Sequence, residues 1–77
     1  VKLLLSQRAK SLLLEEYPLS EKDIRKVRGK WVFEGSVSGM EGVARFVLGL
    51  AAEIQILEGS TLLEYIRDYD KMFIQKL

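Results

Sequence analysis

Residues 42–57 read G-V-A-R-F-V-L-G-L-A-A-E-I-Q-I-L. In the first half of this stretch, apolar side chains recur every three or four residues, which is typical of one face of an α-helix. From Ala52 onward they recur on alternate residues, which is typical of a β-strand. The stretch therefore predicts a helix that runs almost directly into a strand. We expect the helix to place Phe46 and Val47 inward, and Arg45 is the one charged residue in its helical half.

Toward the N-terminus, the same two kinds of element occur in the opposite order. Apolar side chains alternate over residues 1–5, which predicts a short strand. Ser6 then offers a hydroxyl that can cap the start of a helix. Pro18 ends that helix, because the residue before a proline disfavours helical backbone angles. Residues 19–23 are mostly polar, and we expect them to form an irregular connection.

A hairpin and two helix starts complete the pattern. Two β-type runs, residues 24–28 and 31–37, flank Gly29-Lys30 and predict a hairpin around that break. The stretches S-G-M-E (38–41) and T-L-L-E (61–64) have the form of capping boxes, in which a hydroxyl and a glutamate cap the backbone reciprocally. A turn is expected at residues 58–60. The last helix is then expected to align five apolar side chains on one face: Leu62, Ile66, Tyr69, Phe73 and Leu77.

The predicted order is β-α-β-β-α-β followed by a C-terminal helix. Two βαβ halves joined by a hairpin define an α+β, ferredoxin-like sandwich with one additional helix at its end. With 77 residues, the chain is expected to be a single domain spanning 1–77. Because it begins with valine, we expect it to be a fragment of a longer protein.

Composition excludes several classes of chemistry. The chain has neither cysteine nor histidine, so it lacks thiolate ligands, the commonest metal ligand and the usual general base at neutral pH. Basic residues outnumber acidic ones by eight to four in residues 1–30, but are outnumbered seven to four in residues 31–77, a polarity too mild for a nucleic-acid footprint. No apolar run approaches the roughly 18 residues of a membrane span. We expect a cytoplasmic, non-enzymatic protein with no cofactor, metal or membrane partner.

Two groups of residues are candidates for binding. The first is a basic segment along the hairpin: Arg25, Lys26, Arg28 and Lys30. It predicts either a phosphate-binding edge or a charged edge strand that opposes aggregation, which is the more common role of such residues. RNA-binding members of this fold stack bases on exposed aromatic residues, but here only Trp31 and Phe33 lie on a central strand, so no stacking ladder is expected.

The second group is a candidate protein interface formed by Arg45, Phe46 and Trp31. A single tryptophan at the start of a strand most often belongs to a core or an interface. Arg45 has two alternatives. It can pair with Glu41 one helical turn away on the solvent side, or it can face a partner, as interface arginines often do.

Residues 39–50 (G-M-E-G-V-A-R-F-V-L-G-L), residues 52–58 (A-E-I-Q-I-L-E) and Leu62-Leu63 together resemble the C-terminal extension domain of bacterial WYL-type transcriptional regulators. In that family, a helix with a Leu-Gly-like end runs into a strand reading roughly V-x-V-L-x-P, and a leucine-rich helix start follows. The chain departs from this pattern at Gly59, where the family often has proline, and at Ala51, where it often has glycine.

The resemblance implies an accessory role in a larger regulator. The partners it implies are a WYL sensor domain and a helix-turn-helix domain of the same chain, and a second copy in a dimer. DNA would be contacted only through the N-terminal domain. The Trp-Tyr-Leu tripeptide that names the sensor is absent from these residues. The alternative is a stand-alone ferredoxin-like module that binds a small molecule or a protein and is unrelated to DNA regulation.

Overall fold

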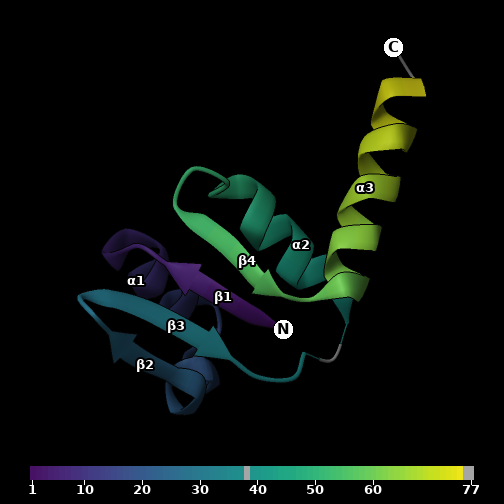
Figure 1. Ribbon diagram of the computed structural model, residues 1–77. Helices are drawn as coiled ribbons and strands as arrows, with labels where there is room; N and C mark the ends of the chain where they lie inside the picture. The colour runs from purple at the N-terminus through teal and green to yellow at the C-terminus, as the bar shows by residue number, and fades with distance from the viewer. Residues whose placement is uncertain (38, 76–77) are drawn as a thin grey trace.

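The computed structural model describes the backbone of residues 1–37 and 39–75, and the side chains of these residues as far as Asp68. Within this part of the chain, a four-stranded antiparallel sheet is combined with three α-helices and a short 3-10 helix (Figure 1). In chain order the elements are β1 (Lys2–Leu5), α1 (Gln7–Glu16), η1 (Pro18–Asp23), β2 (Ile24–Val27), β3 (Lys30–Glu34), α2 (Met40–Gly49), β4 (Ile54–Glu58) and α3 (Ser60–Gln75). The predicted α+β, ferredoxin-like order with an additional C-terminal helix is confirmed.

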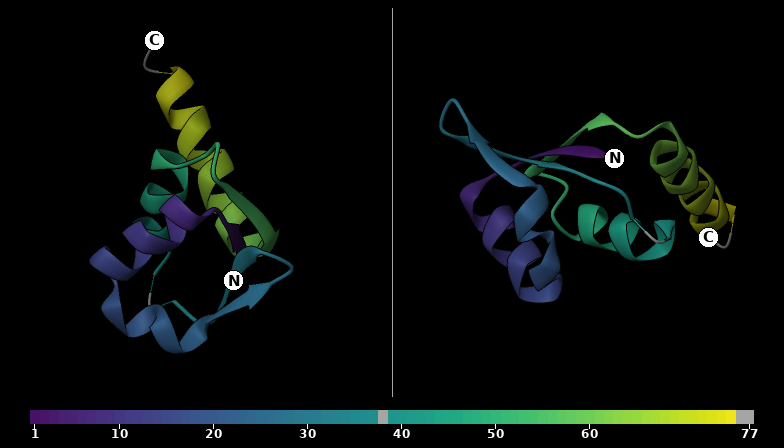
Figure 2. Two further views of the ribbon diagram at one scale, coloured as in Figure 1. Left: turned by 90° about the vertical axis from the view of Figure 1, so that its left-hand side faces the viewer. Right: turned by 90° about the horizontal axis from the view of Figure 1, so that it is seen from below.

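The strand order β2-β3-β1-β4 interleaves the two halves of the fold, because β1 of the first half lies between β3 and β4 of the second. In the register, Leu3 lies opposite Phe33 on one side and Ile56 on the other. Alternate residues of a strand point to opposite faces of the sheet, so these side chains share one face. Helices α1 and α2 cover that face (Figure 2). The buried core lies there, and its members are Leu3, Leu5, Ala9, Leu13, Phe33, Ala44, Phe46, Val47, Ile54 and Leu62.

Helix α1 starts and stops where the sequence predicts. The Ser6 hydroxyl accepts a hydrogen bond from the Ala9 backbone N–H at 3.0 Å and so caps the first turn. Tyr17 ends the helix, and its N–H donates to the Leu13 carbonyl at 2.8 Å. The polar connection predicted after Pro18 is instead a 3-10 helix, Pro18–Asp23. Proline suits its first position, because its fixed φ matches helical geometry and it has no N–H to leave unpaired.

The hairpin between β2 and β3 turns on two residues with left-handed backbones. Arg28 has φ 52° and Gly29 has φ 80°, while Val27 pairs with Lys30. A two-residue loop with positive φ at both positions matches the right-handed twist of the flanking strands. The break is therefore Arg28-Gly29 rather than the predicted Gly29-Lys30, and Lys30 is the first residue of β3.

The predicted capping boxes do not describe the helix starts. Ser38 lies outside the described residues, and the N-cap of α2 is Gly39, which has no side chain to cap with. Helix α3 begins at Ser60, so Thr61 already lies inside the helix and its predicted cap position is wrong. The residue before α3 is Gly59, whose φ of 150° lies in a region that side chains strongly disfavour. The predicted turn at residues 58–60 is thereby reduced to this single glycine.

Strand β4 begins later than its apolar alternation predicts. It starts at Ile54, two residues after Ala52. The delay has a local cause, because the Glu53 N–H donates to the Leu50 carbonyl at 2.8 Å and closes a turn at the end of α2. The Glu53 carbonyl in turn accepts from the Ser6 N–H at 3.0 Å, which ties this turn to the start of α1.

Helix α3 is anchored at its start and projects from the rest of the domain. Leu62 is fully buried and Ile66 packs against the core, and the helix contacts α2. The later turns of α3 extend away from the sheet (Figures 1 and 2). Sixteen residues at about 1.5 Å each make a rod of roughly 24 Å. The predicted apolar positions at Tyr69, Phe73 and Leu77 lie outside the described side chains. No helix in the described part of the chain has the length and apolar character to span a membrane.

Candidate functional site

The four basic residues of the hairpin do not form one patch. Arg25 and Lys30 lie on the sheet face that no helix covers, as does Val32, whereas Lys26 lies opposite Trp31 on the helix-covered face. Arg28 occupies the turn itself. The two-residue period of a strand separates neighbouring side chains in this way. The four predicted residues therefore do not share one face, and β2 has the character of a charged strand at the edge of the sheet.

An ion pair partly neutralises the basic charge on the uncovered face. Arg25 Nη1 lies 2.9 Å from Glu34 Oε1, and both side chains are about half exposed. The hydrogen bond from Arg25, and then the positive charge of Lys2, lower the pKa of the Glu34 carboxyl below its ordinary value. The centre of this face is apolar, since Val32 is buried between its cross-strand neighbours Leu4 and Arg25.

Both aromatic residues of β3 lie on the face that the helices cover. Phe33 is buried in the core. Trp31 is half-buried, and its indole Nε1 donates to Gln7 Oε1 at 2.9 Å. The ammonium groups of Lys10 and Lys26 lie 4.2 and 5.6 Å from the centre of its ring. The aromatic rings of β3 therefore offer no stacking platform on the open face, and the geometry gives no support to RNA binding by base stacking.

Of the two predicted interface residues of α2, the structure exposes one and buries the other. Arg45 is strongly exposed and pairs with Glu41 at 3.4 Å, the solvent-side alternative. Phe46 is buried, and its ring makes an edge-to-face contact with Tyr17, with centroids 6.5 Å apart and planes at 81°. In the folded chain Phe46 is only 7% exposed, so it offers little surface to a protein partner. Of these two residues, only Arg45 is accessible to a partner.

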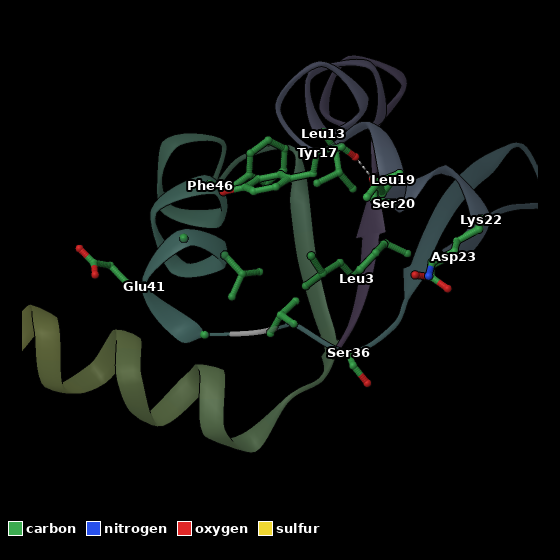
Figure 3. A pocket seen from close by; sticks show the side chains of 15 residues that line it. Leu3, Leu13, Tyr17, Leu19, Ser20, Lys22, Asp23, Ser36, Glu41 and Phe46 are labelled. Carbon is green, nitrogen blue, oxygen red and sulfur yellow. Dashed lines mark hydrogen bonds between the residues drawn. The ribbon is translucent and has the colours of Figure 1, made fainter.

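Sequence reasoning missed a cavity of about 530 Å³ on the helix side of the sheet, between η1 and α2 (Figure 3). Leu3 and Phe33 contribute from the sheet. The other lining residues come from α1, η1, the segment after β3 and α2: Leu13, Tyr17, Leu19, Ser20, Lys22, Asp23, Ser36, Val37, Gly39, Glu41, Gly42, Val43 and Phe46. No local motif indicates this cavity, because its residues belong to six segments (β1, α1, η1, β3, the segment after β3 and α2) that only folding brings together.

Tyr17 connects the two helices beside this cavity. It is the C-cap of α1, yet its ring contacts Phe46 of α2. A methyl group built on Gly42 would lie 3.1 Å from the Tyr17 hydroxyl oxygen, so the absence of a side chain at Gly42 permits this approach. The Tyr17 carbonyl also accepts a hydrogen bond of 2.6 Å from the Ser20 hydroxyl, which holds the start of η1 (Figure 3).

Asp23 is the acidic group closest to the apolar floor of the cavity. A methyl group built on Gly35 would lie 2.9 Å from Asp23 Oδ2 and 3.3 Å from Phe33 Cζ, so the carboxylate and the ring tip adjoin the same point. Asp23 is half-buried and forms no ion pair with any described residue. Glu41 also borders the cavity, but its carboxylate points outward (Figure 3) and pairs with Arg45.

The cavity is the candidate binding site among the described residues. Among them, no cluster of three or more acidic side chains that could hold a metal ion occurs. The cavity combines apolar walls with a few polar groups, among them the unpaired Asp23 carboxylate and the Lys22 side chain, the composition of many small-molecule sites. In comparisons with known proteins, no family model, no curated protein and no solved structure matches this chain.

Proposed function

We propose that this chain is a non-enzymatic regulatory and dimerisation module, the C-terminal extension of a cytoplasmic, helix-turn-helix, WYL-type bacterial transcriptional regulator. The observation that carries the proposal is the geometry of α3, which is anchored at Leu62 and projects from the domain (Figure 1). The resemblance of residues 39–63 to the extension domain of these regulators supports the same assignment.

The exposed side chains near the base of α3 are suited to a protein contact. Leu63 and Tyr65 are 46% and 36% exposed, and a two-residue separation places them on opposite flanks of the helix. Leu62 and Ile66 hold the helix to the core between these flanks. Tyrosine is enriched in protein interfaces, and an exposed leucine gains free energy when a partner covers it. Arg45 on neighbouring α2 adds a charged group at 81% side-chain exposure.

In this proposal the module acts by packing. The partner surfaces are the sensor domain of the same chain and a second copy of the regulator, and DNA is bound only by the helix-turn-helix domain. A ligand bound by the sensor shifts the regulator between two arrangements when it binds one of them more tightly. The module contributes by making contacts that differ between those arrangements, so its role needs neither a cofactor nor a catalytic group.

The coding sequence upstream of Val1 provides the first test. We expect an open reading frame that encodes a helix-turn-helix segment and, after it, a domain with a Trp-Tyr-Leu tripeptide. A reading frame that encodes neither of these two segments would refute the assignment to this class of regulator.

The second test is a substitution in the full-length protein. Leu63→Glu places a charge on an exposed flank of α3, where it does not disturb the core. If this flank packs against a partner, losing the leucine contact costs about 1–2 kcal/mol, which corresponds to roughly a 5- to 30-fold weaker dimer. Light scattering reports the oligomeric state, and gel-shift titration reports operator affinity. The control is Glu64→Gln, an exposed change on the next residue of the same helix. Equal behaviour of both variants and the parent would remove this flank of α3 from the interface.

A further inference from the structure

The cavity between η1 and α2 has a chemistry that points to a ligand. We infer that it binds a small organic amine, with the apolar body of the amine against the floor and walls and its protonated nitrogen paired with Asp23. This inference goes beyond the proposed regulatory role and does not depend on it, because it concerns a site formed entirely by residues of this chain.

The walls of the cavity select an apolar body. Leu3 and Phe33 line it from the sheet, and the rings of Phe46 and Tyr17 line it from the helices. Its volume of about 530 Å³ lies within the range of small-molecule sites. Leu19 lies beside the cavity at 86% exposure, the highest among the exposed large apolar residues. A leucine so poorly covered gains from any apolar group that enters beside it.

The charge of the site selects a cation. The Asp23 carboxylate adjoins the tip of the Phe33 ring, and it forms no ion pair with a described residue, not even with Lys22, which lines the same cavity. A carboxylate beside apolar surface can accept a charge-assisted hydrogen bond from an ammonium group, and such a bond is stronger than a neutral one. The other carboxylate bordering the cavity, Glu41, is already paired with Arg45. Asp23 is therefore the group that distinguishes an amine from a neutral or acidic ligand of the same shape.

Three probes with the same aromatic body test this assignment. They are phenethylamine, phenethyl alcohol and hydrocinnamate, which carry a cation, a hydroxyl and an anion. Each is titrated into the isotope-labelled chain while amide NMR shifts are followed at Gly35, Gly42 and Val43, with the Trp31 indole as a reporter outside the cavity. For ligands of this size, we expect saturable binding of the amine with Kd of about 1 mM. We expect about fivefold weaker binding of the alcohol, and more than tenfold weaker binding of the acid.

Two substitutions separate the parts of the site. Asp23→Asn removes the charge with little change of shape, and we expect the amine and the alcohol then to bind equally. Val43→Phe fills the cavity from α2, and we expect all three probes to bind more weakly. Gly49→Ala is the control, because nothing lies within 4 Å of the added methyl group, and it should bind like the parent.

The comparison of probes on the unaltered chain needs no variant and is the first test. Equal affinity for amine, alcohol and acid would overturn the inference, as would shifts that do not saturate or that move the Trp31 indole as much as the cavity amides. A preference for the amine that persists in Asp23→Asn would also overturn it, because the charge would then be recognised elsewhere. Thermal melts of each variant establish that the fold is retained.

Discussion

Two glycines of α2 offer a direct test of how Tyr17 joins the helices. Replacing a helical glycine with alanine ordinarily stabilises a protein by up to about 1 kcal/mol, because alanine loses less backbone entropy on folding. At Gly49 the added methyl group meets nothing within 4 Å. At Gly42 it would lie 3.1 Å from the Tyr17 hydroxyl oxygen, closer than ordinary van der Waals contact. The same substitution at two positions of one helix is therefore expected to have different effects.

The size of the difference follows from the contact between Tyr17 and Phe46, which a methyl group added at Gly42 would disturb. Its ring makes the edge-to-face contact with Phe46 at 6.5 Å and 81°, a geometry worth about 0.5–1.5 kcal/mol beyond simple burial. Moving the ring away from an added methyl group weakens that contact. We therefore expect Gly49→Ala to raise the free energy of unfolding by about 0.5–1 kcal/mol, whereas the gain at Gly42→Ala is offset by about 1 kcal/mol and falls to near zero.

Urea unfolding followed by circular dichroism measures both variants, with the midpoint reporting stability as long as the slope is unchanged. A Tyr17→Phe background supplies the decisive comparison, because it removes the hydroxyl oxygen and keeps the ring. In that background Gly42→Ala should recover a gain equal to that of Gly49→Ala, a coupling of about 1 kcal/mol between positions 17 and 42. If Gly42→Ala already stabilises the parent as much as Gly49→Ala does, then Tyr17 does not lie over Gly42 and the reasoning fails.

Three further predictions concern the hairpin, the sheet face and α3. Arg28→Asn should raise stability by about 0.5–1 kcal/mol, since asparagine tolerates the left-handed backbone of Arg28 at φ 52° better than arginine; an unchanged or lower thermal midpoint would contradict this turn geometry. The lowered pKa of Glu34 contributes stability above its unfolded pKa, and that contribution is lost as pH falls through the folded pKa. Arg25→Ala should therefore raise the Glu34 pKa, which an NMR titration measures. An unchanged pKa would show that Arg25 is not the cause of the lowering. Leu62→Ala should cost about 2–5 kcal/mol, because Leu62 is fully buried at the base of α3, and a cost below about 1 kcal/mol in urea unfolding would mean that α3 is not anchored there.

Local sequence signals were sufficient for the order of the elements. The switch from helical spacing to alternation within residues 42–57 marks the passage from α2 to β4, and the two periods differ enough to be separated in a short window. The Ser6 cap and the break at Pro18 were also readable, since each depends on the chemistry of one residue. Boundaries were less predictable. The start of β4 depends on the turn that Glu53 closes and on its bond to Ser6, a residue from the other end of the chain.

The candidate sites were less predictable from the sequence than the order of the elements. The basic hairpin and the interface around Phe46 were inferred from residue type, but residue type does not specify which face a side chain occupies. Strand register placed Lys26 and Arg25 on opposite faces, and packing against Tyr17 buried Phe46. The cavity beside Asp23 left no signal in any single window, because its walls come from separate parts of the chain.

The sequence by itself determined the class of fold, the order of strands and helices, and the absence of histidine and cysteine chemistry. These properties depend on composition and on periodicity within a few turns or strands. Only the tertiary structure decided that the Tyr17 side chain lies close to Gly42, that Asp23 adjoins Phe33, and that α3 projects from the domain. Each of these depends on contacts between elements distant in the chain, where side-chain volume and register rather than local pattern set what can approach.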